Sequence, residues 1–160
     1  MELSTFIGIL QESMFMILVF LVFLFFALLR GRQSIVNLIL GLYLALLISL
    51  KFPYYDHFIN SDDPSANAII MIIIFAVLTV LGLLLFGKLM PVPFEETAFQ
   101  GLGKKIIFAL LATILVMAFS YHALPVTDII TPGSPIQALF APESNFFWWL
   151  LLPLAALFFL

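Results

Sequence analysis

The sequence contains no cysteine and very little charge. Charged residues make up 9% of the chain, whereas an average soluble domain has about 25%. The lack of cysteine excludes a disulfide framework, a cysteine metal site and a thiol nucleophile. The lack of charge is more informative, because the surface of a soluble domain needs charged and polar side chains that water can solvate. Lipid removes that requirement.

The chain consists mainly of hydrophobic sequence. Hydrophobic residues make up 64% of the 160 positions, whereas ~45–50% is usual for a soluble domain. The mean hydropathy is +1.25. This composition predicts a single integral membrane domain over residues 1–160, with the lipid bilayer as its surroundings. The net charge is −3, and the sequence has no basic cluster of the kind that indicates a nucleic-acid partner.

Apolar runs divide the chain into segments of membrane-spanning length. A helix rises roughly 1.5 Å per residue, so about 20 apolar residues cross a hydrocarbon core of about 30 Å. We therefore predict an all-α, polytopic transmembrane helix bundle with four spans plus a short fifth apolar C-terminal helix. The expected spans are residues 13–29, 34–50, 68–86, 106–121 and 146–160. Segments 91–103 and 134–141 should lie along the membrane interface.

The last apolar run, 146–160, leaves two arrangements open. Its fifteen residues rise about 22 Å, which is below the usual length of a span, and Pro153 interrupts it. A re-entrant segment is therefore the alternative to a crossing. The run is apolar on every face, so it cannot lie half in water, and Trp148 and Trp149 suit an interface anchor. We favour a short fifth span.

The positions of the basic residues predict the orientation. If the turn at 30–32 is cytoplasmic, then Lys88, Lys104 and Lys105 lie on the same side and only Lys51 lies outside. Loops on the cytoplasmic side carry an excess of lysine and arginine. We therefore expect the N-terminus on the non-cytoplasmic side.

A stripe of small and polar residues follows one face of the second span. These helix-packing residues are Asn37, Gly41, Ala45 and Ser49. Small residues let neighbouring backbones approach closely, so we expect this stripe to face other helices. Asn37 should hydrogen-bond to a neighbouring helix, because lipid offers it no partner. Three leucines of the same helix should lean toward lipid: Leu38, Leu42 and Leu46.

Small residues on two other spans could receive this stripe. The third span offers Ala76, Thr79 and Gly82. The fourth span offers Ala109, Ala112 and Thr113. Helix packing of this kind is a more economical interpretation of the stripe than a pore lining.

No set of residues has the spacing of a catalytic, cofactor or metal site. Transporters and pumps mark their paths with ionisable residues at mid-membrane, and none lies inside the first four spans. His57 and His122 fall on the outer side near acidic residues, but their spacing matches no compact metal motif. We therefore expect no enzyme activity, no cofactor and no metal.

The order of several features is similar to that of a known family. An arginine-containing turn at 29–32 follows the first span, and the small-residue-rich helix over 37–49 comes next. A glycine-and-basic stretch at 101–105 precedes the fourth span, and the pattern at 134–136 leads to an aromatic tail at 146–149. This layout resembles the colicin V production protein family. The resemblance implies a bacterial inner-membrane protein with a role in toxin export or envelope homeostasis.

Two functions follow from these observations. The first is a non-enzymatic accessory or assembly protein of the colicin V production type, acting through a membrane-protein partner or as a homo-oligomer. The second is a small oligomeric channel or transporter. Oligomerisation would be needed there, because four or five short helices enclose little space alone.

Overall fold

The computed structural model describes residues 3–54, 57, 63–90, 101–124 and 135–159, and this part of the chain is helical without strands. The helices are α1 (Leu3–Arg30), α2 (Arg32–Ser49), α4 (Pro64–Leu89), α5 (Leu102–His122), α6 (Pro135–Phe140) and α7 (Glu143–Phe159). Four of these helices, α1, α2, α4 and α5, are long and apolar enough to cross a membrane. Helix α7 is a shorter apolar helix. The predicted all-α class with four spans and a short C-terminal helix is confirmed. The four long apolar helices indicate a multi-pass membrane protein.

The helices extend beyond most of the predicted spans. α1 begins at Leu3 rather than near residue 13, and its 28 residues rise about 42 Å, more than the thickness of a hydrocarbon core. Of the predicted interfacial segment 91–103, residues 91–100 lie outside the described residues, and α5 begins at Leu102. Within the second segment, 134–141, the short helix α6 occupies Pro135–Phe140.

Local chemistry explains where several helices begin and end. Gly31 separates α1 from α2 at a φ of 81°, a left-handed conformation that favours glycine, so the chain reverses within one residue. Asp63 caps α4 by accepting hydrogen bonds from the Ser65 hydroxyl at 2.7 Å and the Ser65 backbone N–H at 3.1 Å, and Pro64 follows at the first helical position. These hydrogen bonds, led by that of the Ser65 hydroxyl, lower the pKa of the Asp63 carboxyl.

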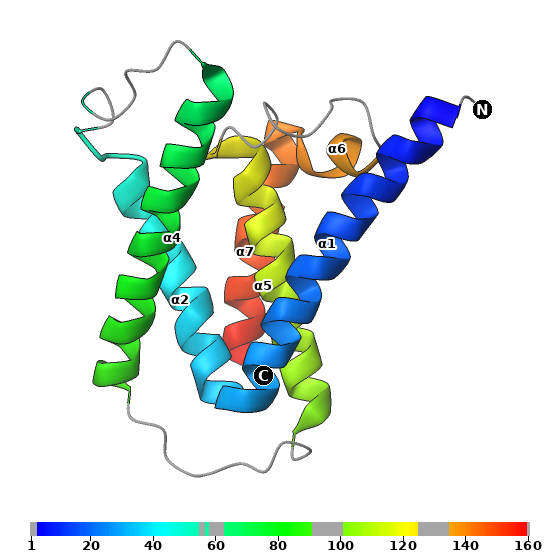
Figure 1. Cartoon of the computed structure of the whole chain (residues 1–160). Helices are drawn as coiled ribbons and strands as arrows, with labels where there is room; N and C mark the ends of the chain where they lie inside the picture. The colour runs from blue at the N-terminus through cyan, green and yellow to red at the C-terminus, as the bar shows by residue number, and fades with distance from the viewer. Residues whose placement is uncertain (1–2, 55–56, 58–62, 91–100, 125–134, 160) are drawn as a thin grey trace.

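α2 and α5 form the interior of the bundle. In the membrane-spanning windows, 50% of the α2 positions and 56% of the α5 positions are buried, compared with 6% in α1 and 17% in α4. α4 packs mainly on α2, while α1 and α7 both pack on α5 (Figure 1). Four fully buried side chains fill the space between α2 and α5: Ile35, Ile39, Leu115 and Phe119.

The two ends of the bundle differ in chemistry. At one end lie the α1–α2 turn, the end of α4 and the start of α5, which together carry most of the basic residues (Figure 1). We call this the basic end; its residues are Arg30, Arg32, Lys88, Lys104 and Lys105. The opposite end carries α6 and the ends of its neighbours. We call it the aromatic end; its residues are Tyr121, His122, Phe140, Phe146 and Trp149.

A proline breaks the hydrogen-bond ladder of α7 where α2 touches it. Pro153 is buried inside α7 and has no N–H to donate to the carbonyl of Trp149 one turn earlier. Beside this break, the hydroxyl of Tyr43 on α2 donates to the Leu150 carbonyl. This hydrogen bond joins α7 to α2 one residue after the Trp149 carbonyl, which the proline leaves without its usual donor.

Candidate functional site

The α2–α4 interface is a direct contact between two backbones at Gly41 and Gly82. A Cβ added to Gly82 would lie 2.8 Å from the Cα of Gly41, and one added to Gly41 would lie 2.9 Å from the backbone N of Leu83. Both distances are shorter than real Cβ atoms tolerate, and the obstructing atoms belong to backbone that cannot swing aside. This close approach requires glycine at both positions. Dispersion between the two helices is correspondingly strong.

The other residues of the predicted stripe are also buried. Ala45 is 0% exposed, Asn37 2% and Ser49 6%. Asn37 lies against α4, because a Cβ on Gly87 would be 4.0 Å from its Nδ2. Its carboxamide oxygen accepts a hydrogen bond at 3.2 Å from Gln33, one turn earlier on α2. The expected bond to another helix is thus not among those the structure describes; the amide is instead held by its own helix.

The prediction that three leucines of α2 face lipid is wrong. Leu38, Leu42 and Leu46 are 9%, 3% and 7% exposed and belong to the main apolar core. The reason is that α2 has α4 on one face and α5 on another, so both are covered. The lipid-facing side of α2 lies elsewhere, at Leu47 and Ile48.

The prediction of which small residues on α4 and α5 are buried against other helices is only partly correct. On α4, Thr79 and Gly82 are buried, and the Thr79 carbonyl oxygen would lie 3.1 Å from a Cβ on Gly41. Ala76, however, is exposed. It lies three residues before Thr79, on a part of the helix surface that α2 does not cover. On α5, all three residues expected to pack are buried: Ala109, Ala112 and Thr113.

Three hydroxyl groups within the spans bind their own helices. Thr79 donates to the Phe75 carbonyl at 2.9 Å, Thr113 to the Ala109 carbonyl at 2.8 Å and Ser120 to the Val116 carbonyl at 2.8 Å. Each acceptor lies four residues earlier, the usual way for a hydroxyl to be satisfied in an apolar helix. These oxygens therefore present little polarity to a solute.

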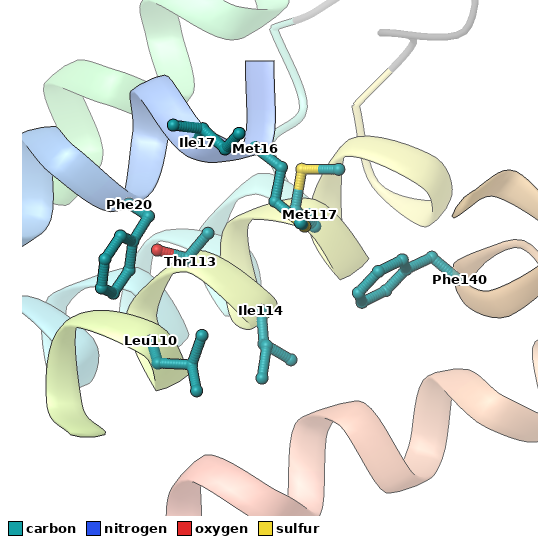
Figure 2. A pocket seen from close by; sticks show the side chains of 8 residues that line it. All are labelled: Met16, Ile17, Phe20, Leu110, Thr113, Ile114, Met117 and Phe140. Carbon is teal, nitrogen blue, oxygen red and sulfur yellow. The ribbon is translucent and has the colours of Figure 1, made fainter. Parts of the chain in front are cut away.

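An apolar cavity of about 180 Å³ lies between α1, α5 and α6, and we call it the α1–α5 pocket. Its lining, drawn in Figure 2, consists of Met16, Ile17, Phe20, Leu110, Thr113, Ile114, Met117 and Phe140. Among these described residues, Thr113 supplies the one polar side chain, and its hydroxyl already donates to the Ala109 carbonyl.

Phe140 of α6 closes the pocket toward the aromatic end. Its ring stacks on Tyr121 with centroids 6.2 Å apart and lies 4.9 Å from the ring of Trp149. Its carbonyl is 2.8 Å from His122 Nε2, which donates when that nitrogen carries the proton. The neighbouring Leu139 carbonyl accepts from Trp149 Nε1 at 3.2 Å. These contacts with α5 and α7 hold α6 in a fixed position above the pocket.

The two histidines make aromatic contacts. The His122 ring lies 4.2 Å from the Phe146 ring, and His57 lies 6.3 Å from Tyr54. Among the described residues, no group of three histidine or acidic side chains is placed to hold a metal ion. At the basic end, the Arg32 guanidinium lies 5.9 Å from the centre of the Phe108 ring, a cation–π distance.

The α1–α5 pocket is not predicted by the sequence. It needs residues from α1, α5 and α6 whose side chains look like ordinary lipid-facing or core positions. One usable signal is the stretch Ser134-Pro135-Ile136-Gln137, whose capping-box spacing and proline at the first helical position predict a short helix. That pattern indicates α6 but not where it packs.

Comparisons with models of protein families, with curated proteins and with solved structures found no match. The resemblance to the colicin V production family therefore stays a prediction.

Proposed function

We propose that the chain is a non-enzymatic membrane accessory or assembly protein that works by associating with other membrane proteins or with copies of itself. The observation that carries the proposal is how its polar groups are used. The hydroxyls of Thr79, Thr113 and Ser120 bind carbonyls of their own helices, and that of Tyr43 binds α7. Catalytic and transport sites instead direct polar groups toward a substrate.

The packing of the interior supports the same proposal. A solute path through one chain would run between α2 and α5, where Ile35, Ile39 and Phe119 are 0% exposed and fill the space. Such side chains are close-packed and leave no room for a permeant ion. The surfaces available for function are thus the outer faces of the bundle and its two ends.

The outer faces are extensive and apolar. Large hydrophobic side chains are exposed along α1, such as Val22 and Phe25, and along α4, such as Val77 and Leu84. In a bilayer, surfaces of this kind are available to lipid and to neighbouring helices.

We also propose that the protein lies in a bacterial inner membrane, with the basic end in the cytoplasm and the N-terminus outside. The gathering of Arg30, Arg32, Lys88, Lys104 and Lys105 at one end supports this orientation. The resemblance to the colicin V production family supports the choice of membrane and a part in toxin export or envelope homeostasis.

Reconstitution separates this proposal from the channel or transporter alternative. Liposomes that contain the purified chain should show the same potassium, proton and amino-acid fluxes as protein-free vesicles, because the interior is filled. Vesicles treated with gramicidin provide the positive control for the potassium and proton fluxes. In mild detergent, the protein mass of each particle, without bound detergent and lipid, should exceed the 18.0 kDa of a single chain. Saturable flux that rises with the protein content, or a monomer without a partner, would overturn the proposal.

A further inference from the structure

The described residues of the α1–α5 pocket offer its occupant hydrocarbon contacts. They are aliphatic and aromatic apart from Thr113, which is 2% exposed and already donates to the Ala109 carbonyl. A water molecule needs two to four polar partners, which this lining lacks. Apolar cavities of about 150 Å³ are known to take benzene-sized guests, so a cavity of about 180 Å³ is large enough for a segment of an alkyl chain.

The pocket opens sideways from the bundle. Ile17 on α1 and Leu110 on α5 are 53% and 49% exposed, so its mouth lies at the outer surface between these helices. From Leu110 to Met117 the pocket follows α5 for about 10 Å, from near the middle of that helix toward the aromatic end. Because α1 and α5 are of membrane-spanning length, this mouth faces the hydrocarbon layer, where acyl chains are the abundant molecules.

The pocket is held open by contacts outside it. Phe140 forms its roof (Figure 2). The ring contacts with Tyr121 and Trp149 and the His122 hydrogen bond hold Phe140 in place. An occupant therefore does not have to order the roof when it binds, which lowers the entropic cost of binding. Because the roof closes the aromatic end, the occupant must enter from the side, below α6.

We propose that the α1–α5 pocket binds one acyl chain of a phospholipid from the leaflet at the aromatic end. The chain lies along α5 between Leu110 and Met117, and the headgroup lies beside α6. The bound lipid fills the gap between α1 and α6, which otherwise make few contacts with each other. This inference needs only that the bundle lies in a bilayer and does not depend on the proposed accessory role.

Lipid retention provides the first test. The full chain is purified from membranes in a mild detergent, washed extensively, and its phospholipid content per chain is measured by mass spectrometry. The wild type should keep about one phospholipid per chain. Leu110→Trp places an indole at the half-exposed mouth and should reduce retention about ten-fold or more, since every 1.4 kcal/mol of lost contact energy changes a dissociation constant ten-fold.

The matched control is Leu84→Trp on α4, an exposed leucine away from the pocket, which should retain lipid like the wild type. Equal retention in the two variants would overturn the proposal, as would a folded wild type that keeps no phospholipid.

A second measurement uses the wild type alone, so it decides the matter even if Leu110→Trp fails to fold. A phospholipid with a photoreactive group in the middle of one acyl chain is added to vesicles that contain the protein. After illumination, adducts should concentrate on residues 16–20 and 110–117, and excess unlabelled phospholipid should compete with them. Adducts spread evenly over α1, α4 and α5 without competition would show ordinary solvation by lipid and refute a site.

Discussion

Replacing Gly82 with leucine should separate α4 from α2 and strongly destabilise the protein. The Cβ alone would lie 2.8 Å from the Cα of Gly41 and 3.1 Å from its carbonyl oxygen, before the rest of the side chain is added. Neither atom can rotate away, so the two helices must move apart along an interface that supplies most of the packing of α4. We expect a loss of about 3 kcal/mol, at the upper end for overpacked sites.

The matched control is Gly87→Leu, five residues later on the same helix. That substitution brings the same gain in helix propensity, but its Cβ would have only the Asn37 amide nitrogen at 4.0 Å. Thermal aggregation of the purified variants in detergent is the measurement. Gly82→Leu should aggregate at a clearly lower temperature than Gly87→Leu, and Gly41→Leu should behave like Gly82→Leu. If all three resemble the wild type, α2 and α4 do not approach as described.

Truncating Phe119 to alanine should produce the second large loss of stability. Its ring is 0% exposed and makes edge-to-face contacts with Tyr43 on α2 at 6.4 Å and Phe75 on α4 at 5.8 Å. In a membrane the side chain remains in an apolar medium after unfolding, so the transfer contribution seen in soluble proteins is small. The new cavity and the loss of the two aromatic pairs still destabilise the fold, and together they should lower the free energy of unfolding by about 3 kcal/mol.

Phe25→Ala is the control for this substitution, because Phe25 is 64% exposed on α1 and leaves no cavity behind. Unfolding of both variants by a denaturing detergent, followed by circular dichroism, gives the comparison. Phe119→Ala should unfold at a lower mole fraction of denaturing detergent, whereas Phe25→Ala should match the wild type. Equal sensitivity of the two variants would mean that α2, α4 and α5 do not meet at Phe119.

The sequence predicts elements better than it predicts their neighbours. The spans could be predicted because bilayer thickness sets the length of an apolar run, and the fully apolar stretch at 14–29 comes within a few residues of that length. The lipid-facing side of α2 could not be predicted. When both the core and the surrounding lipid are apolar, hydrophobic periodicity does not distinguish the buried face of a helix from the exposed one. Leu42 and Leu47 are chemically identical, yet one is 3% and the other 69% exposed.

The small-residue stripe contained part of the missing information. Its spacing singles out Gly41, which does lie against another backbone, but nothing in the stripe distinguishes Gly82 from Ala76 as its partner. The α1–α5 pocket could not be predicted at all, because it depends on how α6 packs between α1, α5 and α7. That packing rests on Phe140, Tyr121 and Trp149, whose sequence separation carries no visible pattern.

Cysteine accessibility in intact cells tests most directly the arrangement of the bundle across a bilayer, since the native chain has no cysteine to interfere. Ser144→Cys, exposed near the aromatic end, should react with a membrane-impermeant thiol reagent added outside. Gly103→Cys at the basic end and Phe159→Cys at the end of α7 should react only after the membrane is opened. Labelling of Gly103→Cys in intact cells would contradict the orientation, and labelling of Phe159→Cys there would contradict a fifth crossing by α7.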